Sequence, residues 1–166
     1  MTELVARCTC GKVELEATGT PMTSVVCHCD DCQAGAQQIE ALPHAGRIRE
    51  PGGGVGYLVY RKDRVRISKG AELLRGYKIR QKSATSRMVA TCCNAALVLT
   101  FDDSRHWVDL YRAAVIGEVP PVQMHVCTKY RQGGVLDTTV PAFPEYPFRL
   151  MVKLLTSRIA MLLQRG

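Results

Sequence analysis

Cysteines limit what this 166-residue chain can fold into more than any other feature of its sequence. There are eight, and seven of them lie in three tight groups: Cys8 and Cys10; Cys27, Cys29 and Cys32; Cys92 and Cys93. Disulfide frameworks are typical of small secreted domains, whereas grouped cysteines in a reducing compartment are more often metal ligands or catalytic groups. We therefore expect metal sites, and we interpret the lone Cys127 as a buried apolar thiol.

Length and composition predict one folded domain in the cytoplasm. With 46% hydrophobic and 22% charged residues, the chain has the composition of a globular protein, which excludes a largely disordered one. No stretch reaches the ~20 apolar residues that a membrane span needs. The start, MTELVARCTC, lacks the apolar core of a secretory signal, although a processed signal would be absent from this sequence.

The segment Cys27-His28-Cys29-Asp30-Asp31-Cys32 is the strongest chemical motif. A C-x-C-x-x-C spacing places three sulfurs on one tight turn, where they can converge on one ion. Zinc prefers thiolates in tetrahedral geometry, and a catalytic zinc keeps one position open beside three protein ligands. We therefore expect an open catalytic zinc at Cys27, Cys29 and Cys32; the alternative is a closed structural site whose fourth ligand comes from elsewhere.

Two further cysteine turns predict a second, structural zinc. In Cys8-Thr9-Cys10-Gly11, the glycine allows both sulfurs to point one way. Cys92 and Cys93 precede Asn94, a residue that tolerates a left-handed turn. Cys93 is expected to share the ion of Cys8 and Cys10. Cys92 either completes that site or points the other way, as fourth ligand of the Cys27–Cys32 ion; we favour the first.

Hydrophobic periodicity predicts a mainly β fold. Apolar residues alternate with charged ones in several short segments, which is the pattern of half-buried strands. A short helix is expected over 30–39, with Asp30 or Asp31 as its N-cap. The expected strands lie within residues 4–17, 22–26, 57–60, 65–67, 74–80, 86–90 and 95–101.

The last part of the chain is expected to be a helical extension, residues 141–166, that follows a β domain of residues 1–140. Pro147 suits the first turn of a helix, and apolar residues then follow helical spacing at Phe148, Met151, Val152, Leu155, Ile159 and Leu162. We expect this helix to pack on the domain or on a second subunit, as in a homodimer. The alternative is that it lies on a membrane surface.

Positive charge is concentrated in one region. The chain has a net charge of +7. Residues 61–87 hold ten Lys and Arg against two Asp and Glu, a balance of +8, and the rest of the chain has a balance of −1. Such a region indicates an anionic ligand, nucleic acid or acidic membrane, or else a solvated strand face. If it binds substrate, it should face a cleft beside Cys27–Cys32.

Other polar and aromatic residues carry weaker signals. His28 lies between two expected ligands and is interpreted as a surface histidine. His44, His106 and His125 have no partner at a metal-binding spacing and are interpreted as ordinary polar residues, and Trp107 and Tyr111 as packing residues.

The order CxCG, then CHCxxC, then a cysteine turn that enters an apolar strand resembles the glutathione-dependent formaldehyde-activating enzyme family, which includes the centromere protein V homologues. The resemblance runs from about Cys8 to Phe101. It implies two zinc ions on a mainly β fold of several small coiled antiparallel sheets stapled by zinc. It also implies that Cys8 and Cys10 bind the structural ion and that Cys27, Cys29 and Cys32 bind the catalytic one.

One position departs from the family pattern. The family's later CxxCG would place a cysteine where this chain has Ala90, and Cys92 stands two positions further on. The Cys92-Cys93-Asn94 turn resembles an uncharacterised branch of the family. The zinc-stapled fold is therefore a firmer expectation than the formaldehyde reaction.

We predict a zinc-dependent enzyme with carbon–sulfur lyase or synthase chemistry on a small thiol adduct of the glutathione type. Arg and Lys from 61–87 would hold the carboxylates of that anionic substrate. The alternative is a non-catalytic, zinc-scaffolded module whose basic face binds nucleic acid or another anionic partner. Aromatic residues, which bind single strands, make up only 6% of the chain, so we favour the enzyme.

Overall fold

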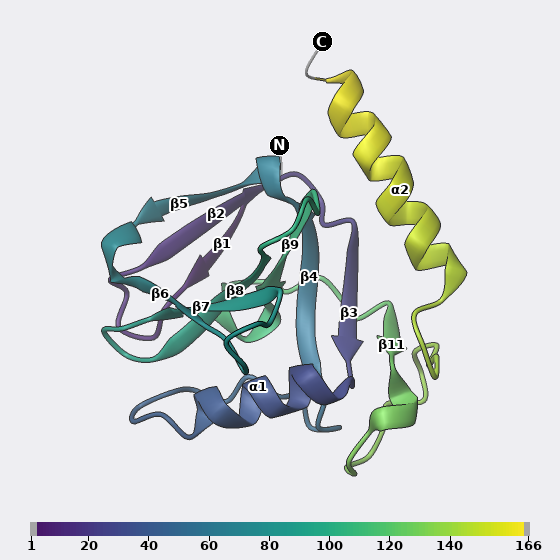
Figure 1. The fold of residues 1–166 in the computed structure, drawn as a ribbon, viewed down its shortest axis with the longest axis horizontal. Helices are drawn as coiled ribbons and strands as arrows, with labels where there is room; N and C mark the ends of the chain where they lie inside the picture. Colours follow the sequence, from purple (N-terminus) through teal and green to yellow (C-terminus); the bar gives the residue numbers. More distant parts are fainter. Residues whose placement is uncertain (1–2, 165–166) are drawn as a thin grey trace.

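The computed structural model describes residues 3–164 and consists mainly of short strands, with two helices (Figure 1). The helices are α1 (Asp30–Glu40) and α2 (Phe148–Leu163). The strands are β1 (Glu3–Arg7), β2 (Glu14–Thr18), β3 (Thr23–Cys27), β4 (Val55–Arg61), β5 (Val65–Lys69), β6 (Leu74–Tyr77), β7 (Thr85–Ala90), β8 (Ala95–Phe101), β9 (Trp107–Tyr111), β10 (Val115–Ile116) and β11 (Met124–Val126). The predicted mainly β class with a C-terminal helix is confirmed.

The smaller sheet has four antiparallel strands in the order β10-β1-β2-β5. Strand β2 shows why it forms: Leu15 and Ala17 are buried, and the alternating Glu14, Glu16 and Thr18 are half-buried. Burying one set of alternating side chains fixes the register, because a shift by one residue would bury the glutamates instead.

The larger sheet has seven strands in the order β11-β3-β4-β9-β8-β7-β6. Its neighbours pair antiparallel, except that β11 pairs with β3 in parallel, with Val126 opposite Cys27. Strands β3 and β4 are buried almost throughout, as strands covered on both faces are. This position holds the last residue of β3, Cys27, at the edge of the core.

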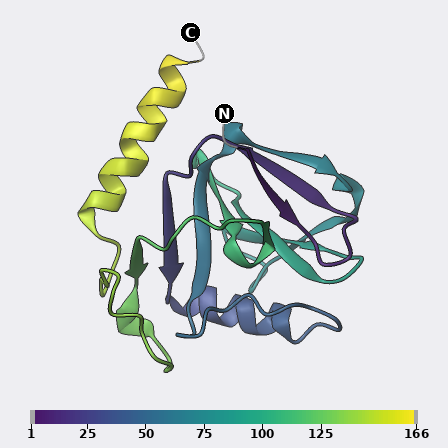
Figure 2. The same ribbon diagram turned by 180° about the vertical axis from the view of Figure 1, so that it is seen from behind.

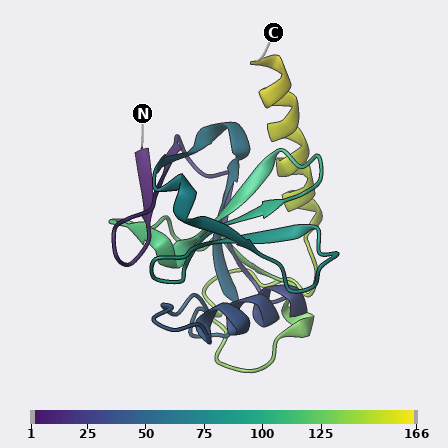
Figure 3. The ribbon, with the colours of Figure 1, turned by 60° about the vertical axis from the view of Figure 1, so that its left-hand side comes forward.

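Helix α1 begins within the predicted metal-binding motif, directly after Cys29, and lies below the strands in Figures 1 and 3. The prediction that Asp30 or Asp31 caps it is wrong. The N-cap is Cys29, whose sulfur accepts a hydrogen bond from the Cys32 backbone N–H, and both aspartates lie in the first turn. Negative charge in a first turn is favourable beside the exposed N–H groups.

Arg87 of β7 ties α1 to the larger sheet. Its side chain is buried, and its guanidinium donates a 2.7 Å hydrogen bond to the backbone oxygen of Asp31. The close approach requires Gly35, because a Cβ there would lie 2.1 Å from Arg87 Nε.

Helix α2 runs along the β3 side of the larger sheet, as Figures 1 and 2 show from opposite sides. It packs through Leu150, Leu154 and Met161, which are buried, and Ser157 lies 2.7 Å from the ring nitrogen of His106. The apolar residues whose spacing predicted the helix lie on its other side and are exposed: Phe148, Met151, Val152, Leu155, Ile159 and Leu162. Within residues 3–164, no helix has the length and apolar content to cross a membrane.

We predict that Gly35→Ala lowers the free energy of unfolding by about 1–3 kcal/mol, the usual cost of overpacking, because the new Cβ displaces the buried guanidinium of Arg87. Denaturant unfolding of the metal-loaded protein measures it. Gly46→Ala is the matched control, since nothing lies within 4 Å of a Cβ there. Equal stability of the two variants would contradict the packing of Arg87 on α1.

Candidate functional site

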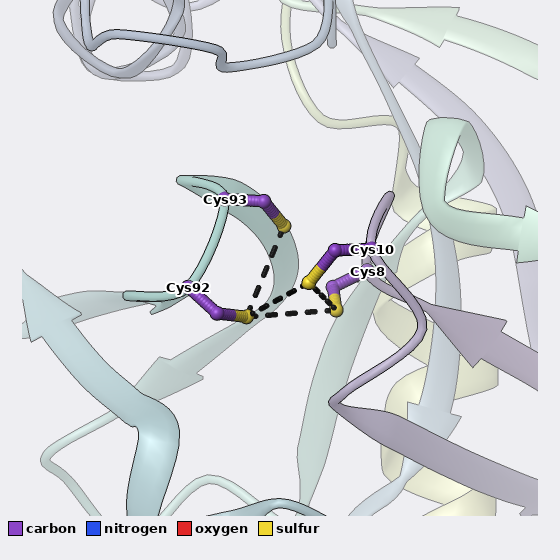
Figure 4. Close-up of side chains that lie close together, drawn as sticks. All are labelled: Cys8, Cys10, Cys92 and Cys93. Atoms are coloured by element: carbon purple, nitrogen blue, oxygen red, sulfur yellow. Dashed lines mark hydrogen bonds between the residues drawn. The ribbon is translucent and has the colours of Figure 1, made fainter.

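Four cysteine sulfurs from two distant turns converge at one point, as Figure 4 shows. Cys8 and Cys10 lie in the turn between β1 and β2, and Cys92 and Cys93 in the turn between β7 and β8. The Sγ–Sγ distances are 3.6 Å for Cys8–Cys10, 3.9 Å for Cys8–Cys92, 3.2 Å for Cys10–Cys92 and 4.0 Å for Cys92–Cys93. This cluster, the four-sulfur cluster, joins the two sheets.

The geometry of this cluster suits a tetrahedral metal ion. Zinc–sulfur bonds of about 2.3 Å in a tetrahedron place neighbouring sulfurs about 3.8 Å apart, close to the distances above. The backbone supports the arrangement, because Gly11 and Asn94 both adopt the left-handed conformation, with φ of +73° and +56°. Hydrogen bonds from the backbone of Cys93 and Asn94 to the Ala90 oxygen close the second turn.

The structure places Cys92 with Cys8, Cys10 and Cys93, which is the arrangement favoured from the sequence. Ala90, where a CxxC pattern would put its first cysteine, is fully buried in β7 opposite Ala95. A side chain at that position points into the core. The sulfur of Cys92 therefore reaches the cluster from the turn itself.

A second group of sulfurs, the three-sulfur cluster, contains Cys27, Cys29 and Cys32, whose Sγ atoms lie within 4.8 Å of one another. Cys27 ends β3, Cys29 caps α1, and Cys32 lies in its first turn. Two tyrosines contact them: Tyr57 Oη donates to Cys32 Sγ at 3.6 Å, and Tyr146 Oη lies 3.7 Å from Cys27 Sγ. Two cysteine clusters in the described part of the chain can therefore hold metal ions.

The surroundings favour a thiolate at Cys29. Hydrogen bonds from the Cys27 and Cys32 thiols lower the pKa of Cys29 well below its usual range, and the Cys32 backbone N–H and the nearby Arg87 add to this effect. Burial raises the pKa of Tyr57 and of Tyr146, so both phenols stay protonated. Thiolates bind metal and protonated phenols donate hydrogen bonds, so these residues suit a metal site.

Sequence reasoning missed two neighbours of the three-sulfur cluster, the thiol of Cys127 and the phenol of Tyr146. Cys127 is buried, as predicted, but interactions with the Cys27 thiol and the Tyr146 phenol lower its pKa. Its sulfur is not within 4.8 Å of all three clustered sulfurs. Cys127 adopts a left-handed φ of +58°, which is uncommon outside glycine. The parallel pairing of β11 with β3 brings it here, and no local pattern indicates that pairing.

The interpretation of His28 as a surface residue is wrong. Its side chain is fully buried, and its Nε2 lies 3.1 Å from Nδ1 of His125, which is also buried. Burial lowers the pKa of His28 to about 4, so the imidazole is neutral at pH 7. His106 is also buried. These histidines pack between elements that are distant in sequence, which is why spacing did not indicate them.

A cavity of about 700 Å³ opens beside the three-sulfur cluster. Strands of the larger sheet form its floor, and Leu150, Met151 and Leu154 of α2 form part of its wall. Three of the ten basic residues in 61–87 line it, namely Arg80, Lys82 and Arg87, together with Arg105. The remaining lining is largely apolar or aromatic, including Val59, Leu99, Phe101 and Trp107.

The rest of the basic region lies elsewhere. Arg66 pairs with Glu16, Lys69 with Glu14 and Lys78 with Asp102. Only part of the basic region 61–87 therefore lines the cleft that was expected beside Cys27–Cys32. In the cavity itself, burial raises the pKa of Asp109 to about 7, although Arg105 opposes the shift. The cavity therefore combines cationic groups with a carboxyl that titrates near neutrality.

We predict that Cys93→Ala lowers both metal content and thermal stability. Loss of one sulfur opens the four-sulfur cluster, in which cysteines of the β1–β2 turn meet cysteines of the β7–β8 turn. Bound metal should fall from two ions to one per chain, with a lower Tm. Metal analysis and thermal unfolding measure these effects; a full metal complement at an unchanged Tm would show that the cluster is not a metal site.

Comparison with known proteins identifies the family of this chain. The family model for glutathione-dependent formaldehyde-activating enzyme matches residues 3–126. Among solved structures, a Rhodobacter sphaeroides protein is 18% identical, with a TM-score of 0.49 over 72% of this chain and 92% of that one. No curated protein matches the sequence. Because the family model covers most of the chain, including both cysteine clusters, the chain belongs to the glutathione-dependent formaldehyde-activating enzyme family.

Proposed function

We propose that this protein is a zinc-dependent enzyme that makes or breaks a carbon–sulfur bond in the adduct of a small thiol, of the glutathione type. The observation that carries the proposal is the three-sulfur cluster at the end of a cavity lined by cationic side chains. Family membership supports glutathione and formaldehyde as the chemical class.

Two zinc ions are proposed, in different roles. Cys8, Cys10, Cys92 and Cys93 supply four sulfurs, the usual complement of a structural zinc. Cys27, Cys29 and Cys32 supply three, the complement of a catalytic zinc with one position for substrate. Zinc bound there would act as a Lewis acid towards the substrate sulfur or oxygen.

The residues around the three-sulfur cluster orient the ligands and the substrate. The Tyr57 phenol donates to Cys32 Sγ, and the Arg87 guanidinium holds the first turn of α1 in place. The Tyr146 hydroxyl lies on the cavity side of Cys27, where it can donate a hydrogen bond to an incoming oxygen or sulfur. Apolar walls from β8, β9 and α2 limit the access of water.

The cationic lining selects for an anionic substrate. Arg105 pairs with Asp103 at 3.1 Å, whereas Arg80 and Lys82 line the cavity without an ion pair to a described residue. Carboxylates of a glutathione-like molecule would form charge-assisted hydrogen bonds with them, which are about twice as strong as neutral ones. The cavity volume of about 700 Å³ falls within the range of small-molecule sites.

Nucleic-acid binding without chemistry has less support. A binding face needs unpaired positive charge, and Arg66 and Lys69 of β5 and Lys78, directly after β6, are paired with carboxylates. Salt-dependent binding of nucleic acid with no turnover of a thiol adduct would favour that alternative.

The test of the proposal is turnover of the glutathione–formaldehyde adduct by the zinc-loaded protein and by Cys29→Ser. We predict that Cys29→Ser binds one zinc instead of two, loses activity and stays folded, because the four-sulfur cluster is intact. Metal analysis, circular dichroism and the rate of adduct turnover measure these outcomes. Unfolding of the variant would show that the three-sulfur cluster is structural, and unchanged activity would exclude it as the reaction centre.

A second prediction concerns the cations. The double variant Arg80→Gln, Lys82→Gln should raise the KM for the anionic adduct at least about tenfold, because each loses a charge-assisted hydrogen bond, with a smaller change in kcat. Steady-state kinetics measures both. Lys62→Gln is the matched control, since Lys62 is exposed and lies in the same basic region but outside the cavity. An equal KM for both proteins would remove these residues from substrate binding.

A further inference from the structure

Helix α2 has two apolar faces, and only one of them is covered. Leu150, Leu154 and Met161 pack on the domain. On the other side, seven apolar side chains are between 41% and 82% exposed: Phe148, Met151, Val152, Leu155, Ile159, Leu162 and Leu163. An exposed apolar surface this continuous is rare on soluble monomers and marks an interaction site.

The exposed residues form one broad stripe. At 3.6 residues per turn they fall within an arc of roughly 120° on the side of the helix away from the domain. A dimeric coiled-coil seam is narrower, with apolar residues at only two positions in seven. The width of the stripe is that of a helix buried along one whole side.

The charges that border the stripe have one sign. Arg149 and Lys153 lie along one border and Arg158 along the other, and residues Phe148–Leu163 contain no Asp or Glu. Glu145, the nearest acidic residue before the helix, is paired with Lys129. The guanidinium of Arg149 lies over the Phe143 ring at 4.5 Å and forms no ion pair with a described residue.

We propose that the exposed face of α2 binds an anionic lipid surface, with the helix lying in the membrane interface. The apolar stripe would enter the boundary between headgroups and acyl chains, while Arg149, Lys153 and Arg158 extend to lipid phosphates. A second copy of the chain fits less well, because two such helices would bring like charges together with no acidic residue on either helix to pair with them. The proposal depends on α2 and not on the proposed reaction.

The position of α2 would place the cavity at the membrane. Leu150, Met151 and Leu154 line the cavity from the helix, and Met151 is also half exposed in the stripe. A helix lying in the interface would therefore hold one wall of the cavity at the lipid surface.

The test is sedimentation of the full chain with vesicles. We expect binding to vesicles of phosphatidylcholine with 30% phosphatidylglycerol, weaker binding to pure phosphatidylcholine, and weakening by salt. Leu155→Glu should abolish binding, and Lys153→Gln should reduce the affinity about fivefold, the usual effect of one basic residue near an anionic surface. Val135→Glu is the matched control, because Val135 is exposed and apolar but lies outside the helix.

Circular dichroism and metal content establish that each variant is folded, and light scattering without lipid gives the oligomeric state. Three results would overturn the proposal: no binding to anionic vesicles, equal binding by Leu155→Glu and Val135→Glu, or a lipid-free dimer that Leu155→Glu dissociates. The last result would assign the face to a second copy. None of these measurements depends on turnover, so failure here is distinct from failure of the proposed reaction.

Discussion

The convergence of Cys8, Cys10, Cys92 and Cys93 is the constraint on which the rest of the structure depends. These residues lie in the β1–β2 turn of the smaller sheet and the β7–β8 turn of the larger one, 82 residues apart for Cys10 and Cys92. Closing so long a loop costs conformational entropy, and an ion bound by the four sulfurs would offset that cost. The relative position of the two sheets follows from this junction.

The second constraint is the start of α1, where one residue both caps the helix and belongs to the candidate metal site. Cys29 is both the helix cap and a member of the three-sulfur cluster, and Arg87 holds the first turn through the Asp31 oxygen. Because Gly35 allows the guanidinium to approach the helix, the sulfurs lie on a turn that the larger sheet holds through Arg87. A rigid support of this kind is what a site needs if its ligands are to stay in place between turnovers.

Much of this arrangement could be predicted from local patterns. The CxC, CxCxxC and CC turns indicated both clusters, and alternation in segments such as Val13–Ala17 indicated the strands. The N-cap was misassigned because a thiol took the role that aspartate usually has. His28, Cys127 and Tyr146 were misread or missed because the β11–β3 pairing and the segment before α2 bring them together. The sequence does not indicate which side of α2 packs on the domain, because the buried and the exposed apolar residues both follow helical spacing.

The central claim is that one cluster is closed by four protein sulfurs and the other is left with three. Diffraction at the zinc absorption edge, from crystals of the zinc-loaded protein, tests it most directly by locating each ion and counting its ligands. The account predicts two ions, one bound by Cys8, Cys10, Cys92 and Cys93, and the other by Cys27, Cys29 and Cys32 with a fourth ligand that is not protein. A single ion, or a second ion whose fourth ligand is the sulfur of Cys127, would contradict it.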